Sequence, residues 1–165
     1  MVLNFNRLFL EALQEIDFVD YQEWLIHDGA PRDHHSSCEI VENYGKAKWG
    51  VVDAVNQRFN TSFDLHNWLH KDQSDELSYF LNEVGSNALN HSEQKAPHKF
   101  HLWLGNKGFI VGIEQQGQGF DAQYVYENQV KQNGGAAFKF FSNCHHEIFF
   151  DDHRNAKMVL MKVKL

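Results

Sequence analysis

The spacing of apolar residues changes at Pro97, and this change constrains the fold more than any other feature of the chain. Before Pro97, one segment has its apolar residues three and four positions apart, the spacing of a single helix face. They are Leu77, Phe80, Leu81, Val84 and Ala88. After Pro97, apolar residues alternate over 100–104 and over 109–113, with a Gly-Asn-Lys-Gly turn between them. The pattern therefore predicts a helix followed by a β-hairpin.

The other predicted helices come from the same kind of pattern. Leu8 to Ile26 has helical apolar spacing and is followed by Pro31, which favours a helix that ends before the proline. Cys38 to Phe59 is predicted to be a second helix. Its expected buried side chains are Ile40, Val41, Tyr44, Val51, Val52 and Val55. Two further helices are expected, one ending near Lys131 and one opening at Gly134-Gly135.

The C-terminal segment predicts a closing hairpin, with strands over Glu147–Phe150 and Lys157–Lys164. The order of helices, strand pair, helices and strand pair indicates an α+β fold. We expect a two-layer sandwich, with helices on one face of a mixed, mainly antiparallel sheet. The chain is predicted to divide into a helical N-terminal region, residues 1–72, that packs on a main domain, residues 73–165.

Composition and charge exclude some partners. The formal net charge is −7, so the surface repels the phosphates of nucleic acids and anionic lipids. We expect no nucleic-acid partner and no membrane partner, because no apolar run approaches the ~18 residues of a membrane span. Two cysteines, Cys38 and Cys144, are too few for a disulfide framework. With no secretory signal at the N-terminus, the expected location is the cytoplasm.

Glu83 and Asn87 are the first candidate functional residues. They lie four positions apart on the predicted helix, so they share a face beside its apolar stripe. A carboxylate at such a border can orient or deprotonate a hydroxyl group or a water molecule. An amide oxygen beside it suits Mg²⁺, which keeps several waters and takes few protein ligands.

Two glycine-containing segments are the next candidates. Gly117 and Gly119 follow directly after a predicted strand, where missing side chains let the backbone approach a flat or anionic ligand. Gly134 and Gly135 open a predicted helix, and free N–H groups at a helix start favour phosphate.

Taken in order, these motifs resemble the GHKL (Bergerat-fold) ATPases, which include histidine kinases and anti-sigma-factor serine kinases. The resemblance rests on Glu83-x-x-x-Asn87-Ala88-x-x-His91, then a hairpin, Gly117-x-Gly119, the Gly134-Gly135 helix start and a terminal hairpin. It covers roughly residues 74–165. It implies an ATP-binding signalling protein with Mg²⁺, closest to kinases that phosphorylate a Ser or Thr of a partner regulator.

The resemblance also implies a role for each candidate residue. Glu83 matches the catalytic base, and Asn87 matches the ligand that holds Mg²⁺ through the nucleotide. Gly117 and Gly119 match the glycines beside the adenine pocket, with residues 123–133 as the lid over the phosphates. Gly134 and Gly135 match the hinge of that lid and the phosphate loop.

Two departures from the family pattern leave an alternative open. Gln115 stands where the family has its adenine-reading Asp, and a Gln amide offers one donor and one acceptor in place of a charge. Ala136 and Ala137 lie in the phosphate loop, where a Cβ restricts close backbone approach. The alternative is a scaffold of the same fold that binds no nucleotide and serves as a phosphotransfer or protein-binding module.

Histidines supply two weaker hypotheses. His27-Asp28, with Pro31 soon after, is similar to a histidine-kinase phosphoacceptor box, in which the N-terminal helices form a dimerisation hairpin. Ligand-type residues over 33–35 and 144–147 suggest a metal-binding regulator, although neighbouring histidines on a strand point to opposite faces. A partner protein and a homodimer are both expected from the family resemblance and the apolar N-terminal segments.

Overall fold

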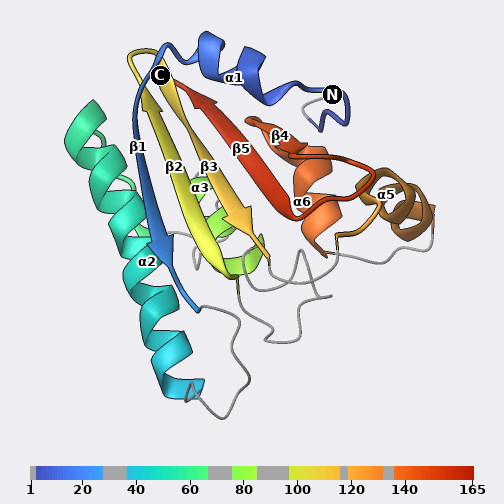
Figure 1. Cartoon of the computed structure of the whole chain (residues 1–165), viewed down its shortest axis with the longest axis horizontal. Coiled ribbons are helices and arrows are strands. Elements are labelled where there is room, and N and C mark those ends of the chain that lie inside the picture. Colours follow the sequence, from blue (N-terminus) through green and yellow to red (C-terminus); the bar gives the residue numbers. More distant parts are fainter. Residues whose placement is uncertain (1–2, 28–36, 67–75, 85–96, 116–118, 132–135) are drawn as a thin grey trace.

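A single five-stranded sheet organises the molecule (Figure 1). The computed structural model describes residues 3–27, 37–66, 76–84, 97–115, 119–131 and 136–165. The strands are β1 (Phe18–Leu25), β2 (Lys99–Gly105), β3 (Gly108–Glu114), β4 (Glu147–Phe150) and β5 (Met158–Lys164). Their order across the sheet is β1-β2-β3-β5-β4, and each neighbouring pair is antiparallel.

Both predicted hairpins are confirmed. In the first, β2 pairs with β3 around the Asn106-Lys107 turn, with Leu102 opposite Val111. Gly108 starts β3 at φ +152, where an added Cβ would lie 2.1 Å from the Val163 carbonyl oxygen. In the second, β4 pairs with β5. Alternation along each strand therefore identified both strand pairs correctly.

The helices are α1 (Phe9–Glu15), α2 (Ser37–Phe59), α3 (Glu76–Tyr79), α5 (Ala122–Lys131) and α6 (Ala136–Asn143). A five-residue π-helix, η3 (Phe80–Val84), continues directly from α3. The predicted helices corresponding to α2, α5 and α6 are confirmed. In Figure 1, α2 runs alongside β1, and α5 lies at the opposite side of the sheet.

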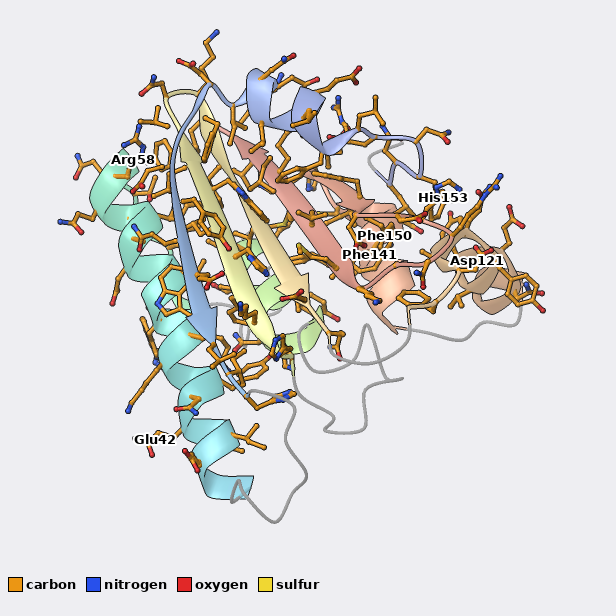
Figure 2. All side chains as sticks on the ribbon, viewed as in Figure 1. Glu42, Arg58, Asp121, Phe141, Phe150 and His153 are labelled. Atoms are coloured by element: carbon orange, nitrogen blue, oxygen red, sulfur yellow. The ribbon has the colours of Figure 1, made fainter. Side chains whose placement is uncertain are left out.

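The main core lies between one face of the sheet and α2, α3, η3 and α6. Its aromatic side chains come from both layers: Phe141 of α6 lies beside Phe150 of β4, with ring centroids 6.3 Å apart (Figure 2). The largest side chains in this core are fully buried. They include Phe80, Phe100, Phe109, Phe141, Leu77, Leu81 and Leu102. The α+β class and the packing of helices against a largely antiparallel sheet are therefore confirmed.

The helix predicted over Leu8 to Ile26 is wrong. Helix α1 ends at Glu15, Asp17 takes a left-handed conformation at φ 55, and residues 18–25 form β1. The helical spacing in this segment was fortuitous, because its aromatic and β-branched residues pair with β2 instead. The first 72 residues are thus not purely helical, and the domain boundary after residue 72 stays a prediction.

The second face of the sheet carries a smaller core. Ala12 and Ile16 of α1 pack there against Ile110, Phe149 and Leu160. One predicted core residue of α2 is also misplaced: Val41 is 70% exposed, while its neighbours on the buried stripe face the sheet. The helical period predicts a buried side chain along the full length of α2. Val41 lies near the start of the helix and is exposed there, so the apolar period alone predicted one buried residue too many.

None of the helices in the described part of the chain combines the length and the apolar character needed to cross a membrane.

Candidate functional site

The segment that carries Glu83 is anchored by its first residues. Leu77, Phe80 and Leu81 are buried in the main core, as the helical stripe predicted. The chain widens into the π-helix η3 from Phe80, so its carbonyl groups are spaced differently from those of an α-helix. The Tyr44 hydroxyl of α2 donates to the Leu81 carbonyl at 2.6 Å. This bond ties the π-helical turn to α2.

The side-chain amide of Asn82, next to Glu83, forms a hydrogen bond through its nitrogen and another through its oxygen. Its nitrogen donates to the Leu65 carbonyl at 3.2 Å, and its oxygen accepts from Lys48 Nζ at 2.9 Å. The Lys48 ammonium also lies 4.4 Å from the centre of the Tyr44 ring. Burial lowers the pKa of Lys48. Within the described ranges no carboxylate pairs with Lys48, so a half-buried positive charge lies beside the turn that contains Glu83.

Gln115 lies immediately after β3 and continues the alternation of Ile113, so it faces the helix-covered side of the sheet. Its backbone N–H donates to the Lys157 carbonyl at 2.8 Å. Its side-chain oxygen is buried and accepts no hydrogen bond from the residues that the structure describes. A buried acceptor without a donor costs ~1–3 kcal/mol, so the site is suited to a ligand that supplies an N–H or O–H.

Gly119 has a structural reason to be glycine. An added Cβ would lie 2.1 Å from Asn155 Oδ1 and 2.8 Å from the Asn155 carbonyl carbon. The next residue, Phe120, exchanges backbone hydrogen bonds with Ala156. The segment after β3 therefore packs directly on the β4–β5 turn, and this contact accounts for the missing side chain without a ligand.

The remaining predicted site residues lie outside the described residues. They are Asn87, Gly117, Gly134 and Gly135, and the side chain of Glu83 is likewise not described. The backbone of Glu83 lies in η3 and Gln115 follows β3, so both belong to the helix-covered side of the sheet. Their assembly with the glycine segments into one site stays a prediction.

Glu76 forms a cluster that sequence reasoning missed. Its carboxylate is 6% exposed and accepts hydrogen bonds from both sides. Oε1 accepts from the His145 backbone N–H at 2.7 Å and lies 2.6 Å from His145 Nδ1. Oε2 accepts from Cys144 Sγ at 2.8 Å and from the His146 N–H at 3.1 Å. The cluster joins the start of α3 to the loop between α6 and β4.

The hydrogen bonds of this cluster determine the direction in which the pKa of Glu76 is shifted. Burial alone would raise the pKa of Glu76, but the hydrogen bonds from Cys144, His145 and His146 together outweigh it and hold that pKa below its ordinary value. The Glu76 carboxylate accepts these bonds from a loop 69 residues further along the chain, a contact that no local sequence pattern could indicate.

A second missed cluster crosses the open part of the other sheet face. The Tyr21 hydroxyl of β1 lies 2.5 Å from His101 Nδ1 of β2, and His101 Nε2 lies 3.1 Å from Glu114 Oε2 of β3. His101 also stacks on Trp103, with centroids 5.4 Å apart and planes at 12°. The hydrogen bond with His101 holds the pKa of Glu114 below its ordinary value. We name Tyr21, His101 and Glu114 the open-face cluster.

Glu23 gives the Tyr21 proton a second acceptor, at 2.8 Å. When His101 is neutral and donates from Nε2 to Glu114, its Nδ1 accepts the proton of Tyr21. When His101 is protonated, Nδ1–H donates to the Tyr21 oxygen and Tyr21 donates to Glu23. Burial, and then the bond with Glu23, raises the pKa of Tyr21, so the phenol stays protonated at neutral pH. Alternation places these residues on one face, but only the sheet order brings them together.

The phosphoacceptor hypothesis for His27 is not supported by its position. His27 lies two residues after the end of β1. It is 3% exposed and lies against His98, with ring centroids 5.6 Å apart. A phosphoacceptor histidine must be reached by a second active site, which burial prevents. In the described part of the chain, no group of three or more His, Cys, Asp or Glu side chains is arranged to hold a metal ion.

Comparison of the whole chain with family models, curated proteins and solved structures found no match in any of the three. The functional argument therefore rests on the residues and geometry described above.

Proposed function

We propose that this chain is a cytoplasmic, ATP-binding regulatory protein of the GHKL type, with Mg²⁺ bound through the nucleotide. The observation that carries the proposal is the buried oxygen of Gln115, which has no donor. It stands at the end of β3 on the helix-covered side of the sheet, at the position implied for adenine recognition. The exocyclic amino group of adenine is a donor that this oxygen can accept.

The order of elements adds support. A helical segment with Glu83 precedes the β2–β3 hairpin, Gln115 follows β3, and α5, α6 and the β4–β5 hairpin complete the chain. This is the succession on which the family resemblance was based. The half-buried ammonium of Lys48 lies beside the Glu83 turn and adds positive charge to a region proposed to bind phosphates.

In the proposed reaction, a Ser or Thr hydroxyl of a partner regulator attacks the γ-phosphorus of ATP. A new O–P bond forms, the bond to the β-phosphate oxygen breaks, and ADP leaves. Glu83 would accept the hydroxyl proton, and Asn87 would hold Mg²⁺, which would supply positive charge against the phosphates. In the same proposal, Gly134 and Gly135 would bind the phosphates, and Gly117 and Gly119 would border the adenine. Positioning and charge neutralisation supply most of the catalysis in such transfers.

Thermal unfolding with and without Mg·ATP tests nucleotide binding. Ligand at ~100 times its dissociation constant adds ~2.7 kcal/mol to the free energy of unfolding, which is a measurable upward shift in Tm. We expect Asn87→Ala to abolish most of this shift and the matched variant Asn90→Ala to keep it. An unchanged Tm at millimolar Mg·ATP contradicts the proposal.

The Gln115 contact has its own test. Guanine presents a carbonyl oxygen where adenine presents an amino group, so GTP cannot donate to the Gln115 oxygen at that position. We expect Mg·ATP to stabilise the chain more than Mg·GTP, and Gln115→Ala to remove this difference. Equal stabilisation by both nucleotides in the unmodified chain would show that Gln115 does not read the base.

The alternative function, a scaffold that binds no nucleotide, is favoured by one observation. Gly119 is explained by its contact with Asn155, so this glycine is no independent sign of a ligand. The Cβ atoms of Ala136 and Ala137 restrict the proposed phosphate loop in the same direction. The absence of any thermal shift with Mg·ATP, together with capture of a partner protein, would support this alternative.

A further inference from the structure

The two edges of the sheet differ in how they are covered. At the β4 edge, the N-terminal segment adds to the strand: Asn4 N–H donates to the Ile148 carbonyl at 2.8 Å, and Leu3 forms a parallel bridge with Ile148. At the β1 edge, no described residue forms a backbone hydrogen bond on the outer side of the strand. The eight-residue strand β1 is thus the longer of the two edges, and among the described residues no segment adds to it.

The direction of the β1 backbone groups follows from its pairing. In an antiparallel pair, residues alternate between pointing their N–H and C=O groups at the partner strand and away from it. Ile26 N–H donates to the His98 carbonyl at 2.9 Å, so every second residue back along β1 also faces β2. The outer edge therefore presents the backbone groups of Tyr21, Glu23 and Leu25.

The side chains of β1 leave this edge accessible. Helix α2 packs beneath the strand, where Trp24 lies so close to Gly50 that a Cβ there would meet its indole ring. On the outer positions, Tyr21, Glu23 and Leu25 are all exposed, Leu25 by 54%. Val19 near the start of the strand is 55% exposed. Soluble proteins usually blunt such an edge with Lys, Pro or a covering segment, and β1 contains neither Lys nor Pro.

Charge decides between the candidate occupants. Strand β1 carries Asp20 and Glu23 and no Lys or Arg, and the whole chain has a net charge of −7. Lys99 of β2 lies 3.5 Å from Glu23 Oε1 and offsets part of the negative charge at this edge. A second copy paired edge to edge would bring two sets of these carboxylates together across a strand spacing of ~4.8 Å. A segment with Lys or Arg at alternate positions pairs with them favourably.

We propose that the outer edge of β1 binds an extended segment of a partner protein by β-strand addition, and that this segment alternates basic with β-branched or aromatic residues. Backbone hydrogen bonds at Tyr21, Glu23 and Leu25 supply the affinity, and the acidic side chains select the basic partner. The proposal concerns a different surface from the nucleotide site and does not depend on nucleotide binding.

A fluorescently labelled nine-residue peptide of alternating Lys and Val is the probe. Its control is the same peptide with every backbone nitrogen methylated, which keeps the charge and removes the donors needed for strand addition. We expect the first peptide to bind in fluorescence anisotropy, with affinity at least tenfold above that of the methylated peptide. Equal binding of both would mean that only charge attracts the peptide, and binding of neither would also overturn the proposal.

Substitutions locate the contact. Glu23→Pro removes an outward N–H, at an edge position where proline is tolerated, and is expected to weaken peptide binding at least tenfold. Glu23→Gln keeps the N–H and is expected to weaken it only about threefold. If Glu23→Pro does not fold, hydrogen exchange of the unmodified chain replaces it: the peptide should protect the amides of Tyr21, Glu23 and Leu25. A stable dimer at micromolar concentration, or protection elsewhere only, contradicts the proposal.

Discussion

The two faces of the sheet are stabilised by different kinds of interaction. On the helix-covered face, fully buried aromatic and aliphatic side chains from α2, α3, η3 and α6 fill the space between the layers. On the other face, α1 covers a small apolar cluster, and the rest carries the open-face cluster of Tyr21, His101 and Glu114. The same strands supply both faces, because successive side chains point in opposite directions.

The two faces contribute differently to the free energy of unfolding and to its dependence on pH. Apolar burial is worth ~25 cal/mol per Å², so the helix-covered face supplies most of the folding free energy. Partly exposed hydrogen bonds and ion pairs contribute ~1 kcal/mol or less each, but their strength changes with pH. Apolar substitutions on the helix-covered face should therefore have large effects that do not depend on pH. Substitutions in the open-face cluster should have small effects that do, and Glu76 is the buried carboxylate that combines a large effect with pH dependence.

The largest effect is expected from Phe100→Ala. The Phe100 ring is fully buried on the helix-covered face and lies 5.7 Å from the Tyr44 ring. Its loss removes transfer energy and leaves a cavity, at a cost of ~3–5 kcal/mol in urea unfolding. Trp103→Ala, on the same strand but the other face, is the matched comparison. Because Trp103 is only partly buried, we expect a cost ~1–2 kcal/mol smaller. A larger loss of stability in Trp103→Ala than in Phe100→Ala would contradict the difference between the two faces.

The second effect concerns Glu76, the one buried carboxylate of the helix-covered side in the described residues. Glu76→Gln replaces the acceptor of several hydrogen bonds, at an expected cost of ~2–3 kcal/mol near neutral pH. Because the folded pKa of Glu76 is lowered, its contribution is present above the unfolded pKa and is lost as pH falls through the folded one. Urea unfolding at pH 7 and pH 3 should show the variant approaching the unmodified chain at low pH.

An equal stability difference at both pH values would mean that Glu76 acts by packing and not by its charge. The matched control is Glu42→Gln, which changes an exposed carboxylate of α2 that pairs with Lys46 (Figure 2). We expect this control to cost less than ~0.5 kcal/mol.

Glu114→Gln tests the open face and should have a smaller effect. The His101 hydrogen bond is the main reason that the Glu114 pKa lies below its ordinary value of 4.5. The carboxylate therefore stabilises the fold above pH ~4.5, and this contribution disappears as the pH falls through the lowered pKa. We expect a cost of ~0.5–1 kcal/mol at pH 7. Urea unfolding at pH 7 and pH 3 should show this difference shrinking at low pH, and a difference of equal size at both pH values would contradict the role of the Glu114 charge.

Tyr21→Phe is expected to cost less than Glu114→Gln, ~0.5 kcal/mol or below, because only a partly exposed hydroxyl is removed. The raised pKa of Tyr21 gives a sharper test than stability does. At pH 10, the ordinary pKa of a tyrosine, Tyr21 stays protonated and adds no phenolate absorbance. The phenolate absorbance of the variant should therefore equal that of the unmodified chain, and a lower absorbance in the variant would show that Tyr21 ionises.

Local pattern predicted much of the fold correctly, and the exceptions share a cause. The hairpins at β2–β3 and β4–β5 and the helix α2 were identified, because their side-chain period and turn residues lie within a few positions of one another. Strand β1 was mistaken for part of a helix, because its partner β2 lies about 80 residues further along the chain. Pairing at that distance leaves no trace in a local window.

The candidate site also has features that the sequence determined and features that only the tertiary structure decided. The sequence by itself determined which residue types stand at each position of the predicted nucleotide motif, including Gln115 at the end of β3. Only the tertiary structure decided that Gly119 packs on Asn155 and that β1 lies at an edge of the sheet. It also decided that, among the described residues, nothing donates to the buried Gln115 oxygen and no strand adds to β1. Burial and hydrogen-bond partners depend on contacts between distant segments, and the order of the strands in the sheet decides which segments meet.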